Sequence, residues 1–149
     1  MIDVYQQLRK EGSADASTLL RIEHTQIIQP PDVLRMKAWN ITASVQPVHC
    51  ISDAPMAEKR LAHRCSHAYP WRSLRDAGIS LCAGSDFPIE SNDPLIGIDA
   101  FCRRVPFGSV NTWYGDERIS RDEALLAYTE WAHRAADVSY RRGTLTEGY

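Results

Sequence analysis

The stretch ISLCAGSDFPIE, residues 79–90, runs through small and apolar residues and stops at Asp86, a carboxylate that lies between Gly84 and Pro88. Asp, Gly and Pro are the usual residues of a turn after a strand, where a carboxylate accepts hydrogen bonds from backbone amides. The carboxyl end of a parallel strand is also where α/β proteins keep their functional groups. The rest of the chain decides which of these two roles Asp86 has.

Two more strands are predicted upstream of this one. LLRIEHTQ, residues 19–26, alternates apolar and polar positions, which places Ile22 and His24 on one face. ITASVQP, residues 41–47, is the next strand and is closed by its proline, while PDVLRMKAWN, residues 31–40, has the pattern of a helix between the two. Arg21 and Glu23, on the opposite face of the first strand, are interpreted as ion-pair or helix-packing residues.

The remaining segments carry helical spacing or capping residues. Asp93 caps one helix, and Ser120 with Glu123 forms a capping box for another. Strands that alternate with helices predict β-α-β units, and therefore a parallel sheet in one α/β domain. GTLTEGY, residues 143–149, is interpreted as the start of a further strand. The predicted helices span residues 1–10, 31–40, 55–64, 69–78, 91–104 and, as one long helix, 119–142.

The composition excludes several classes of function. With 149 residues and a net charge of −2, the chain has no basic surface suited to nucleic acid or to an anionic membrane. No apolar run approaches the roughly 20 residues that a membrane span needs, and the first residues do not have the pattern of a signal peptide, so a cytoplasmic location is expected. The four cysteines are irregularly spaced, which predicts buried thiols rather than a disulfide or zinc motif.

Segments spread along the chain carry motifs of a known family. Together, and in this order, they resemble the C-terminal half of metal-dependent amidohydrolases, in the long-chain branch that is similar to N-acyl amino acid deacylases and exoenzyme regulatory proteins. The segments are RIEHTQ (21–26), ASVQPVH (43–49), AYPWRSL (68–74), AGSDFPIESNDPLIGI (83–98), and ISRDEALLAYT (119–129) with GTLTEGY (143–149). They cover nearly the whole chain, which makes the resemblance more specific than one short motif.

The resemblance implies the C-terminal part of a (β/α)₈ TIM barrel, with about three strands and their helices in residues 1–142 and the start of a small β-sandwich in residues 143–149. The three predicted strands would be the sixth, seventh and eighth of the barrel. His24 and Asp86 would then bind a divalent metal, most suitably Zn²⁺, with one or two ions in the intact protein. Asp86 would also accept a proton from the attacking water and return it to the leaving amine.

Other candidates keep two interpretations each. His49 either lines the substrate cleft or lightly contacts the metal site, assisted by Gln46, or it is a loop histidine that bonds to the backbone. Arg72 is either a clamp for a substrate carboxylate or a member of a structural ion pair. His63, Cys65 and His67 have metal-binding side chains but lack a fourth ligand at usable spacing, so a site there is disfavoured.

The length of the chain bears on the function. A (β/α)₈ barrel takes about 250 residues, so the implied function, metal-dependent hydrolysis of non-peptide C–N bonds in a small-molecule substrate, is assigned to an intact protein. This chain is expected to be an incomplete fragment that is inactive alone and that needs either the missing N-terminal half or further copies of itself. A non-catalytic half-barrel remnant and one subunit of a split enzyme are the alternatives.

Overall fold

The computed structural model describes residues 1–148 and has a parallel sheet of three strands in the order β1-β2-β3. The strands are β1 (Leu20–Glu23), β2 (Ile41–Val45) and β3 (Leu81–Ala83). The mixed α/β architecture confirms the predicted class, and all three strands lie within predicted segments. Each strand is shorter than predicted, so His24 and Asp86 follow their strands rather than end them.

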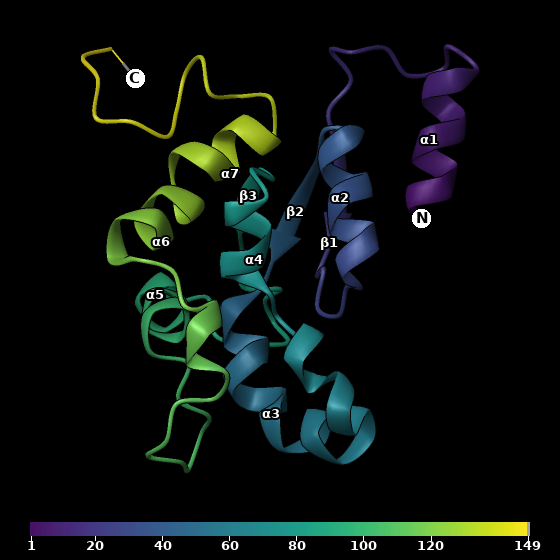
Figure 1. Ribbon diagram of the computed structural model, residues 1–149. Coiled ribbons are helices and arrows are strands. Elements are labelled where there is room, and N and C mark those ends of the chain that lie inside the picture. The colour runs from purple at the N-terminus through teal and green to yellow at the C-terminus, as the bar shows by residue number, and fades with distance from the viewer. Residues whose placement is uncertain (149) are drawn as a thin grey trace.

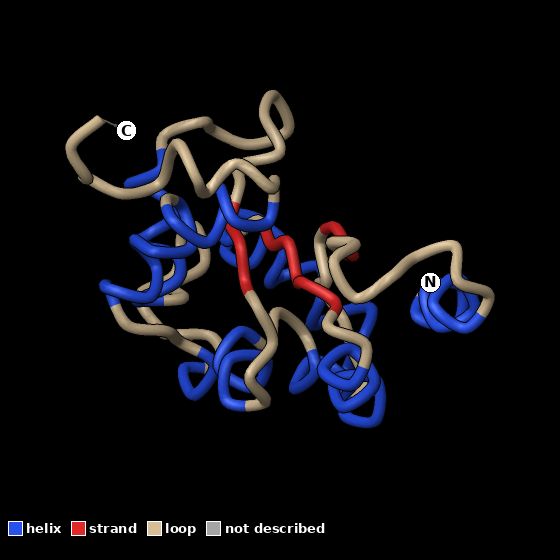
Figure 2. The backbone as a smooth tube through the Cα atoms, turned by 90° about the horizontal axis from the view of Figure 1, so that it is seen from above, coloured by secondary structure: helices blue, strands red, loops and turns tan. Residues whose placement is uncertain are grey.

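Helices occupy most of the connections (Figures 1 and 2). No helix in the described part of the chain is long and apolar enough to cross a membrane. The helices, with the short 3₁₀ segments η1 and η2, are α1 (Ile2–Lys10), α2 (Pro30–Ala38), α3 (Pro47–Leu61), η1 (Ala62–His67), α4 (Trp71–Asp76), α5 (Pro94–Arg103), η2 (Gly115–Glu117), α6 (Arg121–Tyr128) and α7 (Glu130–Ala135).

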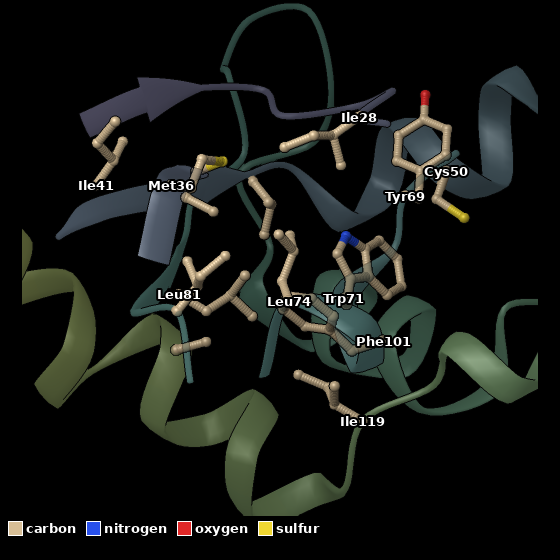
Figure 3. Close-up of a cluster of buried hydrophobic side chains, with 14 of the residues drawn as sticks. Ile28, Met36, Ile41, Cys50, Tyr69, Trp71, Leu74, Leu81, Phe101 and Ile119 are labelled. Carbon is tan, nitrogen blue, oxygen red and sulfur yellow. The ribbon is translucent and has the colours of Figure 1, made fainter. Parts of the chain in front are cut away.

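One face of the sheet forms the core. Alternate residues of β2, namely Ile41, Ala43 and Val45, are buried in a cluster that also contains Trp71 and Phe101 from the helices (Figure 3). The indole of Trp71 packs edge-on against the Phe101 ring, with the centroids 4.6 Å apart. The opposite face is small and polar, with the Arg21–Glu23 ion pair at 2.5 Å and buried Ser44 and Cys82.

A buried cation fastens the connections around this core. The Arg104 side chain is fully buried over the faces of Trp71 and Trp113, and it donates hydrogen bonds to the carbonyls of Trp113 and Tyr69 at 2.9 and 2.8 Å. Burial lowers the pKa of this guanidinium. Its partners are carbonyls and aromatic faces from two segments, one after α5 and one before α4. Arg104 therefore links these two segments.

The connection after β2 differs from the prediction. A helix was predicted to begin at Pro55, but α3 begins at Pro47 and runs through Pro55 to Leu61. A proline inside a helix leaves the carbonyl four residues earlier without its amide donor. Here that carbonyl belongs to Ile51, and it accepts a hydrogen bond of 3.0 Å from the backbone N–H of Phe107 instead.

The C-terminal part also differs. The single long helix predicted over residues 119–142 is wrong, because Thr129, at φ −119° and ψ −97°, separates α6 from α7. The Thr129 hydroxyl donates to the carbonyl of Leu125 at 2.7 Å, a side-chain bond that competes with regular helix geometry. Residues 143–148 form turns and bends rather than a strand, and Tyr149 lies outside the described residues. The β-sandwich, which would need further strands to pair with this segment, stays a prediction.

Candidate metal centre

Three side chains from three successive strand connections meet at one point. His24 follows β1, His49 lies in the first turn of α3 directly after β2, and Asp86 follows β3. A nitrogen from each imidazole and an oxygen of the carboxylate all lie within 4.8 Å of one another. Carboxyl ends of parallel strands lie at the same edge of a sheet, so the topology itself brings these residues together.

The backbone at two of these residues is unusual. His24 has φ 68°, the following Thr25 has φ 40°, and Asp86 has φ 59°, all in the left-handed region that non-glycine residues seldom adopt. This conformation ends the alternation of β1 at Glu23. His24 therefore lies beyond β1, with its imidazole in the three-residue group, while Ile22 packs against the core. The prediction that the two residues share a face stays a prediction.

His49 is the most enclosed member of the group. Its side chain is 9% exposed, its Nε2 lies 3.7 Å from Oδ2 of Asp86, and its ring stacks on that of His24 with the centroids 5.7 Å apart. The Nε2 atom is buried without a hydrogen-bond partner among the described residues. Buried polar atoms are normally hydrogen-bonded, so this nitrogen is oriented toward something that the polypeptide does not supply.

Gln26 holds the other side of the His49 ring. Its Nε2 atom lies 3.2 Å from His49 Nδ1. Metal-binding histidines usually donate the second ring N–H to an acceptor, and the Gln26 amide would present such an acceptor, its Oε1 atom, after a half-turn of the amide group. The sequence analysis missed Gln26, and the available signal was its place two residues after His24 in the same turn.

Gln46 lies at the end of β2, immediately before α3. Its side chain is buried, and its Oε1 atom has no hydrogen-bond partner among residues 1–148. An unpartnered carbonyl oxygen in a buried position is an acceptor for a bound molecule. The structure thus places both predicted cleft residues, Gln46 and His49, on the connection between β2 and α3.

A contact between two elements holds the Asp86 loop in place. The Ser52 hydroxyl, one turn along α3 from His49, donates to Oε1 of Glu90 at 2.7 Å and lies 3.3 Å from the His49 carbonyl. Glu90 belongs to the same loop as Asp86, between β3 and α5. No local pattern in the sequence predicts this pair, because its partners are 38 residues apart.

Arg72 lies in α4 and has the contacts of its structural alternative. Its guanidinium pairs with Glu123 at 2.9 Å and with Asp76 at 3.6 Å, and it donates to the carbonyl of Arg118 at 3.2 Å. The structure does not bring it together with the group of His24, His49 and Asp86. Its role as a carboxylate clamp therefore has no support from its described contacts.

The second cluster of potential ligands does not assemble. His63, Cys65 and His67 lie along η1, and Cys65 is buried. Among the described residues, His24, His49 and Asp86 are the one group of three or more side chains at ligand spacing. All four cysteines are free thiols, as predicted, and burial raises the pKa of Cys50 to about 12.

The donor set of the three-residue group fits a divalent cation. Two imidazole nitrogens and one carboxylate oxygen are the ligands that Zn²⁺ and similar ions bind in catalytic sites, where three protein ligands leave one position open. The unpartnered Nε2 of His49 is consistent with this use. A separate cavity of about 280 Å³ lies at the amino ends of the strands, away from the three-residue group. Its lining includes Asn40, Thr42, Ser80 and Trp131.

Three known proteins have sequences similar to that of this chain. Protein LONG AFTER FAR-RED 3 of Arabidopsis thaliana is 33% identical over 99% of this chain, which corresponds to 26% of that protein. Putative amidohydrolase YtcJ of Bacillus subtilis is 32% identical over 87% of the chain and 25% of its own length. N-substituted formamide deformylase of Arthrobacter pascens is 27% identical over 99% of the chain and 27% of its own length.

Two crystal structures are similar in fold to this chain. An uncharacterized metal-dependent hydrolase of Pyrococcus furiosus matches 99% of this chain with a TM-score of 0.78 and 27% identity. One of Pyrococcus horikoshii OT3 matches 98% with a TM-score of 0.81 and 26% identity. The chain spans 29% of each of these proteins, and about a quarter of the curated relatives. The model of the amidohydrolase family matches residues 1–149, and the chain therefore belongs to the amidohydrolase family.

Proposed function

We propose that this chain supplies metal ligands and a proton-carrying carboxylate to a hydrolase of non-peptide C–N bonds in small molecules. The observation that carries the proposal is the convergence of His24, His49 and Asp86 from three separate strand ends. The family membership and the metal-dependent hydrolases among the structural neighbours support a hydrolytic reaction. The name of N-substituted formamide deformylase supports the choice of a C–N bond.

The three side chains would hold the cation, most suitably Zn²⁺, and an intact protein would contain one or two such ions. When bound, the ion supplies a Lewis acid that polarises a carbonyl and makes water a stronger nucleophile near neutral pH. His24 and His49 would each bind through one imidazole nitrogen. Gln26 would keep the His49 ring in place through the other.

Asp86 is the group suited to move the proton. Its Oδ2 atom lies near His49, whereas its Oδ1 atom receives no hydrogen bond from the described residues, and the side chain is 39% exposed. This carboxylate can therefore orient a water molecule, accept its proton as the C–O bond forms, and deliver that proton to the nitrogen as the C–N bond breaks. The free Oε1 of Gln46 can accept an N–H of the substrate.

We further propose that the three parallel strands are the last three of a (β/α)₈ barrel. The alternation of strand and helix, the parallel order, and the position of the candidate ligands at the carboxyl ends support this assignment. The other strands would come from a polypeptide segment outside residues 1–149, from a separate subunit, or from further copies of the chain. The cytoplasmic location stays a prediction.

The first prediction tests the ligands. The variants His24→Ala and Asp86→Asn should lower Zn²⁺ affinity, measured by competition with a chromophoric chelator, by at least about tenfold, as expected when a ligand or its support is lost. Asn tolerates the left-handed backbone of Asp86, so Asp86→Asn removes the charge without adding strain. His63→Ala removes a histidine outside the group and is the matched control.

Hydrolysis is tested on the assembled protein. The chain is co-expressed with the N-terminal part of the Pyrococcus furiosus hydrolase, loaded with Zn²⁺, and assayed on a panel of N-acyl amino acids and cyclic amides. We expect metal-dependent turnover that falls by about two orders of magnitude or more in Asp86→Asn, because general acid–base catalysis contributes that much. A complex that forms and binds Zn²⁺ but hydrolyses none of these compounds would favour the non-catalytic remnant.

A further inference from the structure

An apolar cavity adjoins the candidate metal centre. It has a volume of about 110 Å³, and its walls include Ile27, Met56, Ala57 and Leu61. Ile27 belongs to the turn that carries His24, and the other three belong to α3, the helix that carries His49. In Figure 1, α3 lies beyond the end of the sheet to which the β2 arrow points, and this helix carries both His49 and part of the cavity wall.

Helical spacing places the cavity and His49 on one stripe of α3. Residues three and four apart along a helix share a face. From His49 this stripe continues through Asp53 and then Met56 and Ala57, which all line the cavity beyond the histidine. Arg60 follows one turn later along α3, is exposed, and places a positive charge at the edge of the cavity.

One side chain separates the cavity from the centre. Gln26 lines the cavity and also contacts Nδ1 of His49 at 3.2 Å. A molecule that extended past Gln26 would therefore have one end in the cavity and the other beside His49. Gln26 is thus the boundary that the cavity shares with the candidate metal centre.

Two polar side chains of the cavity wall, Tyr69 and Asp53, bond to each other. The Tyr69 hydroxyl donates to Oδ2 of Asp53 at 3.0 Å, and the Tyr69 backbone N–H donates to the Gln26 carbonyl. Burial and the neighbouring Asp53 raise the pKa of Tyr69, which keeps the hydroxyl protonated for this bond. The walls formed by Ile27, Met56, Ala57 and Leu61 are apolar, so the space between them favours an apolar group.

We propose that this cavity is the subsite for an aliphatic group of the substrate, about four or five carbons in size. The estimate follows from volume, because a dry cavity of about 150 Å³ holds a benzene ring. The inference rests on the proposed function and narrows it to amides that carry a compact branched or linear alkyl chain. Met56, which is unbranched and half-exposed, lets the wall adapt to either shape.

The test measures binding without metal or turnover. Methyl NMR of the full chain, which remains observable in an oligomer, follows the signals of Ile27, Met56, Ala57 and Leu61 as 3-methylbutanamide is added. We expect these signals to shift in a saturable way, and to remain unchanged with acetamide at the same concentration. Met56→Trp, which fills the cavity, should weaken binding by at least about tenfold, because the alkyl group loses its buried surface.

Two further variants complete the design. Met56→Ala enlarges the cavity and should shift the preference toward hexanamide, and Leu34→Trp places the same ring on exposed α2 as the matched control. Absence of saturable shifts in the parent, or equal binding by Met56→Trp and the parent, would overturn the subsite. Binding that persists while the loaded complex hydrolyses no amide would leave the subsite in place and contradict the proposed reaction instead.

Discussion

Gln26 contacts His49 through an amide, and an amide can serve either tautomer of the ring. Donation from the Gln26 NH₂ group to Nδ1 leaves the proton of His49 on Nε2. A half-turn of the amide instead accepts a hydrogen bond from Nδ1–H and leaves Nε2 with a free lone pair for a cation. Metal binding at His49 therefore requires the second orientation.

The second prediction follows from this choice of orientation. Gln26→Glu offers only acceptors, so it should fix the tautomer with Nδ1 protonated and tighten Zn²⁺ binding, whereas Gln26→Leu should weaken it by about tenfold to a hundredfold. Chelator competition measures both, with Gln29→Glu in the exposed position before α2 as the control for added charge. Equal affinity in Gln26→Leu and the parent would show that Gln26 does not orient the ring.

At the level of elements, Glu123 joins the start of α6 to α4. Its carboxylate accepts hydrogen bonds from the backbone N–H and the hydroxyl of Ser120, both at 3.0 Å, and pairs with Arg72 at 2.9 Å. Partial burial acts to raise the pKa of Glu123, but the bonds from Ser120 and the charge of Arg72 outweigh it and lower the pKa below 4.5.

The third prediction concerns the acid dependence of stability. A carboxyl whose pKa is lowered by folding stabilises the protein above the pKa of the unfolded chain, and this contribution is lost as the pH falls through the folded pKa. In urea unfolding, Glu123→Gln should thus be less stable than the parent at pH 7, and the difference should shrink below about pH 4.5. Asp122→Asn, an exposed neighbour in the same helical turn, is the control and should show no comparable trend.

The elements also show what the sequence could and could not predict. Asp93 and the box of Ser120 and Glu123 were recognised as helix caps because their bonds are local, and the structure confirms both. The start of α3 was misplaced because a proline normally opens or breaks a helix, and the compensating N–H of Phe107 is 56 residues from the Ile51 carbonyl in sequence (107 − 51).

In the candidate metal centre too, the features that depend on local sequence were predicted and the contacts between distant segments were not. His24 and Asp86 were selected by resemblance and by their places after apolar strands, and the structure brings them together with His49. Gln26 and the Ser52–Glu90 pair were missed, because their contacts depend on how one strand connection packs against another. The left-handed backbone at His24 has no signal in a strand-like pattern, where only alternation is visible.

For the whole molecule, the sheet determines how the chain behaves alone. β1 and β3 are the outer strands, and each pairs with β2 on one side within the described residues. Phe87 and Ile89, in the Asp86 loop, are large apolar side chains with more than half of their surface exposed. Unpaired strand edges and exposed apolar side chains promote association.

The fourth prediction is that the isolated chain forms oligomers or aggregates at micromolar concentration. Light scattering coupled to size-exclusion chromatography measures the mass, and co-expression with the N-terminal part of a related hydrolase should convert the chain into a discrete complex. A monomer of 16.8 kDa with one cooperative unfolding transition would contradict this expectation. It would favour an independent interaction module.

The candidate ligands come from three strand ends, at positions 24, 49 and 86, so a cation at this point would add a further link between three parts of the chain. A ligand that binds only the folded state raises the free energy of unfolding by about 2.7 kcal/mol when its free concentration is a hundred times its dissociation constant. In a cell, unfolded protein is removed by proteases. Scarcity of the metal would then reduce the amount of this protein in the cell, as well as the activity of each copy.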